Sequence, residues 1–206
     1  MNYGGSFPYR IGLTGNIATG KSTVAQMLVA LGAEYVDADR VAHEVMAPGG
    51  AVHDAVVAAF GADVLAPDGT LDRRALGNIV FSDPAALTRL ESLVHPATIA
   101  EVQRRVDASK APIVVMEAIK LLESGMAASY DAIWVTTCPP EVQLTRLMQQ
   151  RGLSRADALR RIQTQSPQAE KIARADVVIH TGGTLEETQA QVVEQVKKMS
   201  KWQMKK

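Results

Sequence analysis

The sequence predicts an α/β fold built on a five-stranded parallel sheet. Five short apolar runs, suited to buried strands, alternate with helical stretches, and the chain contains no internal repeat. Parallel strands joined by right-handed helical crossovers, and covered on both faces, bury such runs economically. The runs lie at residues 10–14, 35–36, 113–116, 133–135 and 177–179.

Length and composition exclude several classes of protein. The chain has 206 residues, of which 22 are basic and 22 acidic, and 47% are hydrophobic. We expect a chain of this length to form one globular unit that has its own core and can carry an insertion, and its balanced charge gives no overall field that would recruit nucleic acid or an anionic membrane. Cys138 is the single cysteine, so no intrachain disulfide forms. We therefore expect a cytoplasmic monomer or weak homo-oligomer with no nucleic-acid or membrane partner.

The N-terminal residues 1–6 are polar and glycine-rich, which indicates a loose leader without the apolar segment of a signal peptide. No apolar run in the chain reaches the length of about 18 residues that a membrane-spanning helix requires. At the other end, residues 184–199 are typical of a final amphipathic helix, and residues 197–206 form a basic tail that we expect to fray.

Uneven strand spacing predicts two helical inserts in the sheet. The longest gap between apolar runs has a mostly helical pattern, and a proline at its first position opens a long helix near Ser82-Asp83-Pro84, which Pro96 is expected to kink. A second, arginine-rich helical stretch follows the fourth strand. We therefore predict a core of residues 1–38, 109–140 and 172–206, with inserts at residues 39–108 and 141–171.

One motif points directly to chemistry. Directly after the first strand, and before a helix expected at residues 23–31, the chain reads Gly-Asn-Ile-Ala-Thr-Gly-Lys-Ser, which is the phosphate-loop pattern G-x-x-x-x-G-K-[ST]. Its glycines let successive backbone N–H groups face a phosphate chain at a helix N-terminus. Lys21 can reach the β- and γ-phosphates, and the Ser22 hydroxyl can bind their Mg²⁺. The expected ATP-binding residues of the loop are Gly15, Asn16, Ile17, Ala18, Thr19, Gly20, Lys21, Ser22 and Thr23.

The motif predicts a P-loop NTPase-type, three-layer α/β/α architecture that uses ATP with Mg²⁺, but the same loop serves kinases, ATPases and GTPase switches. The chain contains no Asn-Lys-x-Asp tetrapeptide for guanine recognition, so guanine switching is disfavoured. Two helical inserts around a small sheet favour a small-molecule kinase, because phosphoryl transfer needs an acceptor pocket, positive charge and exclusion of water.

Two acidic residues follow predicted strands. Asp39 comes just after the second strand, at the sheet edge where such folds bind ligands, and can orient an acceptor hydroxyl and take its proton late in the transfer. An equally weighted alternative is that Asp39 caps a helix over residues 40–46. Glu117 ends the third strand and is a candidate, with Ser22, for the magnesium shell; the alternative is a solvated strand end.

Arginines of the second insert are candidates for clamping the charge on the γ-phosphoryl group. Arg146 and Arg151 lie nearest the expected mouth of the site and are preferred, Arg146 with a catalytic role beside Lys21. Most arginines on helices are only solvated, so the pattern alone does not decide the role of either residue.

Beyond the loop, several short motifs together resemble the bacterial dephospho-CoA kinase family. They include Asp37-Ala38-Asp39, an Asp-Gly-x-Leu-x-Arg-x-x-Leu pattern, a His-Pro pair and a late Gln, in family order across nearly the whole chain. The matching stretches are residues 12–15, 20–25, 31–32, 36–39, 48–49, 60–61, 68–76, 95–96, 165 and 175–176. The segment at residues 120–124, Lys-Leu-Leu-Glu-Ser, departs from the family's usual Pro-Leu-Leu-x-Glu.

The resemblance implies transfer of the ATP γ-phosphoryl group to the ribose 3′-hydroxyl of dephospho-CoA, the last step of coenzyme A synthesis. By that likeness, Asp39 is the acceptor-orienting base, residues 39–108 bind the acceptor and residues 141–171 form a lid. Arg73, Arg74 and His95 stand at family motif positions in the first insert and are candidates for acceptor binding or for shaping that insert.

Two other functions stay open from the residues alone. One is a different P-loop kinase, acting on a nucleoside monophosphate or a polyol, since only the first insert would choose the acceptor. The other is a nucleotide-dependent switch or binding module with the basic tail, residues 197–206, as an interaction arm. A kinase turns over only with its acceptor, whereas a switch binds and slowly hydrolyses nucleotide alone.

Overall fold

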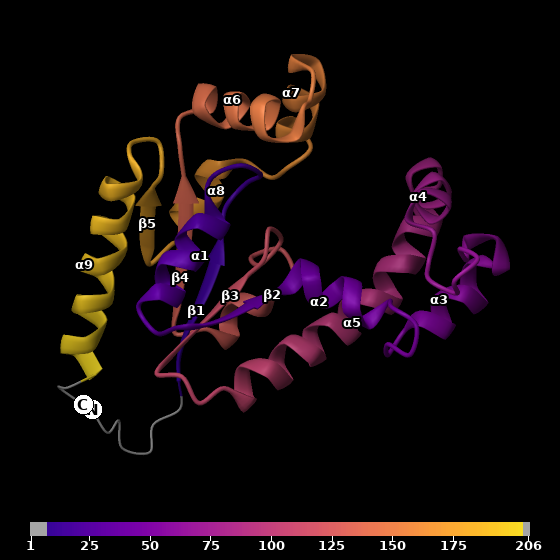
Figure 1. Cartoon of the computed structure of the whole chain (residues 1–206), viewed down its shortest axis with the longest axis horizontal. Helices are drawn as coiled ribbons and strands as arrows, with labels where there is room; N and C mark the ends of the chain where they lie inside the picture. Colours follow the sequence, from indigo (N-terminus) through magenta and orange to yellow (C-terminus); the bar gives the residue numbers. More distant parts are fainter. Residues whose placement is uncertain (1–7, 204–206) are drawn as a thin grey trace. The chain divides into compact units, whose positions relative to one another are not determined.

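The computed structural model describes residues 8–203, and Figure 1 shows its helices and strands. The predicted N-terminal leader and the last three residues of the basic tail lie outside the described residues. The chain divides into two compact units. The first comprises the residues up to Tyr35 together with those from Ser109 onward, and the second is the contiguous stretch Val36–Ala108.

The predicted five-stranded parallel sheet is confirmed. Its strand order is β2-β3-β1-β4-β5, so β1 lies at the centre and pairs in parallel with both β3 and β4. In this register Leu13 of β1 lies opposite Glu117 of β3 and Trp134 of β4. The strands are β1 (Tyr9–Thr14), β2 (Glu34–Asp37), β3 (Ile113–Glu117), β4 (Ala132–Thr137) and β5 (Val177–His180).

Strand alternation builds the core of the first unit. Ile11 and Leu13 point to one face of β1, where α1 (Lys21–Ala30) and α9 (Leu185–Gln203) cover the sheet with buried residues such as Leu28 and Val192. Gly12 points to the opposite face, where an added Cβ would meet the side chains of Leu121, Ile133 and Tyr130. Both faces of the sheet are therefore covered, as the continuous apolar strands require.

Three helices lie between β4 and β5. They are α6 (Pro140–Arg151), α7 (Arg155–Gln163) and α8 (Gln168–Ala173). Gly152 ends α6 with a φ of 61°, and the Ser154 side chain caps α7 by accepting the Asp157 N–H, so the two helices form a tight turn. We call residues 140–163 the α6–α7 hairpin.

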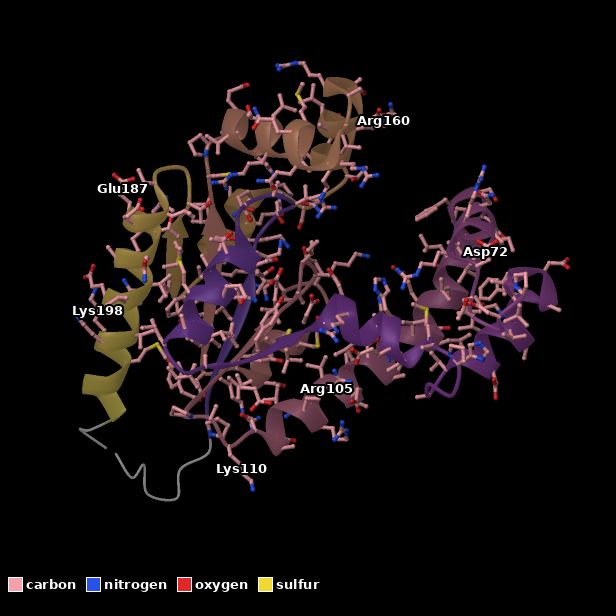
Figure 2. The ribbon with its side chains drawn as sticks, in the orientation of Figure 1. Asp72, Arg105, Lys110, Arg160, Glu187 and Lys198 are labelled. Carbon is pink, nitrogen blue, oxygen red and sulfur yellow. The ribbon has the colours of Figure 1, made fainter. Side chains whose placement is uncertain are left out.

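The second unit contains four α-helices among its described elements: α2 (Ala38–Val45), α3 (His53–Phe60), α4 (Arg73–Ser82) and α5 (Pro84–Ala108). Aspartate carboxylates begin three of them: Asp37 caps α2, Asp72, labelled in Figure 2, caps α4, and Asp83 accepts the Ala85 N–H at the start of α5. α5 packs against α2 and continues through Pro96 without a break in the helix. The predicted helical character of this stretch is confirmed.

Three local expectations were wrong. α1 begins at Lys21 rather than at residue 23, because Gly20 in the left-handed region already starts the helix within the motif. α2 is capped by Asp37, whose side chain accepts the Arg40 N–H at 3.0 Å, so Asp39 is not the cap and lies in the first helical turn. The last helix extends to Gln203, beyond the predicted end at residue 199, so part of the basic tail is helical.

Candidate active site

The phosphate loop connects the central strand to α1, and its conformation depends on two glycines. Gly15 has a φ of 147°, and a Cβ there would lie 2.6 Å from the Thr136 carbonyl oxygen. Gly20 has a φ of 88°, in the left-handed region that favours glycine. These two positions bend the backbone around the site, which is why the motif fixes glycine at both ends of the loop.

Lys21 is folded into the curl of the loop. Its side chain is only 6% exposed, and Nζ donates to the carbonyl oxygens of Gly15 at 3.0 Å and Asn16 at 3.2 Å. Carbonyl oxygens are weaker partners for an ammonium than phosphate oxygens, because charge-assisted hydrogen bonds are the stronger ones. The loop therefore holds the Lys21 ammonium against neutral carbonyl oxygens. A bound phosphate chain would replace these carbonyls as the stronger partner of the ammonium.

Ser22 and Glu117 meet beside the loop. Ser22 Oγ donates to Glu117 Oε1 at 3.3 Å, and the hydroxyl of Tyr35 donates to Glu117 Oε2 at 2.8 Å. Glu117 is 9% exposed, so the alternative of a simple solvated strand end does not hold. A hydroxyl and a carboxylate are the hard oxygen ligands that Mg²⁺ prefers, and the structure brings the two predicted metal residues together.

The first two residues after Gly15 are anchored by glutamine side chains. The Asn16 N–H donates to Gln168 Oε1 at 3.0 Å, and Gln168 Nε2 donates in turn to the Thr136 carbonyl at 2.8 Å. The Ile17 N–H donates to Gln165 Oε1 at 2.8 Å, while its carbonyl accepts from Gln143 Nε2 at 2.7 Å. These backbone groups are therefore already occupied by protein.

The second half of the loop is different. Across the described part of the chain, no partner is found for the backbone N–H groups of Ala18, Gly20 and Ser22. Gly20 and Ser22 belong to the start of α1, where the helix dipole also favours a negative ligand, and Ala18 lies two residues before its N-cap. The loop thus separates into an anchored first part and a second part whose donors are available to phosphate oxygens.

Arg146 joins α6 to the loop. Its Nη1 donates to the Ala18 carbonyl at 3.3 Å and to Thr181 Oγ1 at 3.1 Å, and Nη2 donates to the Thr181 carbonyl. The structure thus brings this predicted residue to the loop. Arg151 is the last residue of α6 and is exposed, and within the described residues no hydrogen bond or ion pair connects it with the loop.

The remaining predicted residues lie in the second unit. Asp39 is in the first turn of α2, and Arg73 begins α4, where its Nη1 lies 3.3 Å from Nε2 of His43. Arg74 and His95 are exposed on α4 and α5. Over the described residues, no hydrogen bond joins Arg73, Arg74 and His95 to one another. His43 was not singled out in the sequence, and its closeness to Arg73 follows from packing between helices.

Comparison with known proteins decides the family. A family model described as dephospho-CoA kinase matches residues 9–187. The chain belongs to the dephospho-CoA kinase family. It is 47% identical over 186 residues to a dephospho-CoA kinase of Geobacter metallireducens, with 89% of this chain and 92% of that protein covered.

Solved structures agree with membership of the dephospho-CoA kinase family. A dephospho-CoA kinase from Campylobacter jejuni is 28% identical with a TM-score of 0.70, and the match covers 93% of this chain and 97% of that one. The protein TT1252 from Thermus thermophilus is 34% identical with a TM-score of 0.82 over the same shares of the two chains. Among the described residues no helix is long and apolar enough to cross a bilayer.

For this member of the dephospho-CoA kinase family, sequence reasoning missed the groups that hold the loop. The resemblance included Gln165 but gave it no role, and Gln143, Gln168 and Tyr35 were not considered. A glutamine on a predicted helix does not by itself indicate a functional site, because its side-chain amide can hydrogen-bond to solvent as readily as to backbone groups. Only the fold shows that these amides end at the loop.

The departing segment after β3 contributes an ion pair in which the lysine is buried and the glutamate is exposed. Lys171 of α8 is 2% exposed, and its Nζ donates to Glu123 Oε1 at 2.7 Å and to the Ile119 carbonyl at 2.9 Å. Ser166 Oγ also donates to Glu123. Desolvation raises the pKa of Glu123, but the hydrogen bonds from Lys171 and Ser166, a backbone hydrogen bond and the positive charge of Lys171 together outweigh it and hold the pKa below its ordinary value. The pair fixes α8, which carries Gln168.

Proposed function

We propose that the chain transfers the γ-phosphoryl group of ATP to the ribose 3′-hydroxyl of dephospho-CoA, giving coenzyme A and ADP. The observation that carries this proposal is the phosphate loop with its Lys21 ammonium and the Ser22–Glu117 pair, in a chain that belongs to the dephospho-CoA kinase family. In the transfer, the bond from the γ-phosphorus to the bridging oxygen of ADP breaks, and a bond to the acceptor oxygen forms.

On the donor side, the open N–H groups at the start of α1 bind phosphate oxygens. Lys21 exchanges its carbonyl partners for the β- and γ-phosphates, where its charge stabilises the transition state. Arg146, held against the loop at Ala18, adds positive charge on the side of α6. Arg151 is a second candidate for this role, contributed by the end of the same helix.

The residues present fit a Mg²⁺ ion. Ser22 Oγ and Glu117 offer oxygen ligands, and the hydroxyl of Tyr35 orients the carboxylate from its other side. When bound with ATP, the ion neutralises developing charge on the phosphates. Tyr35 and Ser22 together fix Glu117 in one orientation before nucleotide arrives.

On the acceptor side, Asp39 orients the 3′-hydroxyl and accepts its proton as the new bond to phosphorus forms. Its place in the first turn of α2 leaves the capping role to Asp37, which favours a functional reason for this second carboxylate. Arg73, Arg74 and His95 are proposed to contribute to binding of the acceptor, whose diphosphate carries negative charge.

ADP release from Mg-ATP tests the proposal. Purified protein is offered dephospho-CoA, AMP, CMP, shikimate, gluconate or no acceptor, and the phosphorylated product is identified by mass. Turnover with dephospho-CoA alone, yielding coenzyme A, is expected. Turnover with another acceptor would support a kinase but exclude dephospho-CoA as its substrate. Equal slow hydrolysis in every tube would favour the nucleotide-dependent switch.

A further inference from the structure

The side chain, the N–H and the carbonyl of Ile17 in the phosphate loop all contact the segment between β4 and β5. Its side chain, 9% exposed, packs in an apolar cluster with Leu144, Leu147 and Ala158 of the α6–α7 hairpin. Its carbonyl accepts from Gln143 of α6, and its N–H donates to Gln165, just beyond α7. One residue of the loop therefore belongs to the packing of the hairpin.

Gly15 and Thr19, two residues to either side of Ile17, are held by the sheet and the residues at its edge instead. Thr19 Oγ1 is 2.8 Å from Thr136 Oγ1 of β4, and the Thr19 carbonyl accepts from Thr181 Oγ1 at 2.8 Å. Gly15 follows directly from β1 and lies against Thr136. Ile17 and Ala18, whose carbonyl accepts from Arg146 of α6, are thus held by the hairpin, while Gly15 and Thr19 on either side of them are held by the core.

This arrangement couples the position of the α6–α7 hairpin to the conformation of the phosphate loop. Close-packed side chains transmit displacement instead of absorbing it, so a shift of the hairpin moves the Ile17 peptide group. The adjacent N–H of Ala18 is among the open donors of the loop, and Ala18 has a φ of 60° that a non-glycine residue adopts only under restraint. A change at residue 17 therefore reorients donors proposed to bind phosphate.

We propose that Ile17, with Gln143 and Gln165, is a positioning element that couples the α6–α7 hairpin to nucleotide binding. A bound phosphate chain fixes the loop and so holds the hairpin, and a seated hairpin holds the loop donors in their binding arrangement. By linkage the two effects are equal in free energy. The inference rests on the proposed function only in that the loop binds ATP, and it does not depend on the acceptor.

Two measurements without acceptor test the coupling. The first is the Kd of a non-hydrolysable β,γ-imido ATP analogue with Mg²⁺. The second is the rate of tryptic cleavage at Arg151 and Arg155, which flank the turn between α6 and α7. In the unaltered protein the analogue binds and slows this cleavage severalfold. Absence of binding would refute both the proposed function and the coupling, whereas binding without protection would refute the coupling alone.

Ile17→Ala removes the side chain that enters the cluster. We expect the Kd of the analogue to rise about tenfold and the protection by nucleotide to disappear, whereas Ile17→Val restores most of both. The matched control is Leu153→Ala, which removes a side chain packed against the same cluster but outside the loop. Leu153→Ala speeds cleavage with and without the analogue and leaves the ratio of the two rates unchanged.

A second variant covers the case in which Ile17→Ala does not fold. Gln165→Met keeps the size of a half-buried side chain and removes the acceptor of the Ile17 N–H, so it weakens the coupling with little effect on packing. The proposal is overturned if Ile17→Ala, or Gln165→Met in its place, keeps the protection ratio of the unaltered protein. It is equally overturned if Leu153→Ala loses that ratio to the same extent.

Discussion

Ser22 Oγ lies 3.3 Å from Oε1 of Glu117, so a hydroxyl of the phosphate loop and a carboxylate at the end of the neighbouring strand share one hydrogen bond. The pairing follows from the sheet, since β1 and β3 are adjacent and the register sets Glu117 opposite Leu13, one residue before the end of β1. Two chain segments separated by the whole second unit therefore supply one candidate metal site.

Glu117→Gln should weaken use of Mg²⁺ more than binding of the nucleotide itself. The amide keeps the shape of the side chain but loses the negative charge that attracts a divalent cation, so we expect the Mg²⁺ concentration for half-maximal turnover to rise at least about tenfold. A Mg²⁺ titration at saturating ATP measures it. Tyr35→Phe removes only the second hydrogen bond to Glu117 and should give a smaller rise. Identical titrations for the unaltered protein and Glu117→Gln would exclude a metal role.

Lys21→Ala should reduce kcat by about three orders of magnitude, because it removes the ammonium that stabilises charge on the transferred group. The released carbonyls of Gly15 and Asn16 remain within the loop, so the fold should persist. ADP release with dephospho-CoA gives the rate, and circular dichroism checks folding. A folded variant with more than a tenth of normal activity would remove Lys21 from the chemistry.

Asp39→Asn should lower kcat by about 100-fold or more, since the amide can neither accept the proton of the acceptor nor hold its hydroxyl in the same way. Binding of ATP should be unchanged, because the nucleotide contacts proposed above lie in the first unit. Isothermal titration with the β,γ-imido analogue separates the two quantities. The matched control is Asp37→Asn, which makes the same change two residues earlier, keeps a side-chain oxygen for the cap of α2 and should leave both turnover and stability nearly unchanged. Full turnover in Asp39→Asn would exclude this residue as the base.

Glu123→Gln should destabilise the protein at neutral pH by about 2 kcal/mol, below the usual cost of breaking a buried ion pair because Glu123 is 39% exposed. The loss arises mainly because the buried Lys171 ammonium is left without its carboxylate. The folded-state pKa of Glu123 lies below the ordinary 4.5, so its stabilising contribution is present above pH 4.5 and is lost as pH falls through the lowered value. Urea unfolding at pH 7 and near pH 3 should therefore show a difference between unaltered protein and variant that shrinks with acid. A pH-independent difference would contradict this.

The sequence predicted most of the fold and those site residues that were expected to bind phosphate and metal, because these features depend on short contiguous patterns. The phosphate-loop motif identified Lys21 and Ser22, and the strand pattern placed Glu117 where the structure joins it to Ser22. The glutamine anchors escaped prediction because Gln165 and Gln168 reach the loop from about 150 positions further along the chain. The alternative role of Asp39 as a helix cap was decided by a shift of two residues in the start of α2, a difference within the uncertainty of helix ends.

The division of the chain into units has a consequence for the order of assembly on the ribosome. β1 and the loop that follows it are synthesised first, but the partners of β1 are β3 and β4, which emerge only after Val36–Ala108 has been completed. The helical unit is one contiguous stretch, so all of its helices are available to pack together before β3 has been synthesised. The nucleotide-binding half of a nascent chain must therefore wait for its C-terminal strands, and a chain from which the insert has emerged but β3 has not still carries an unpaired central strand.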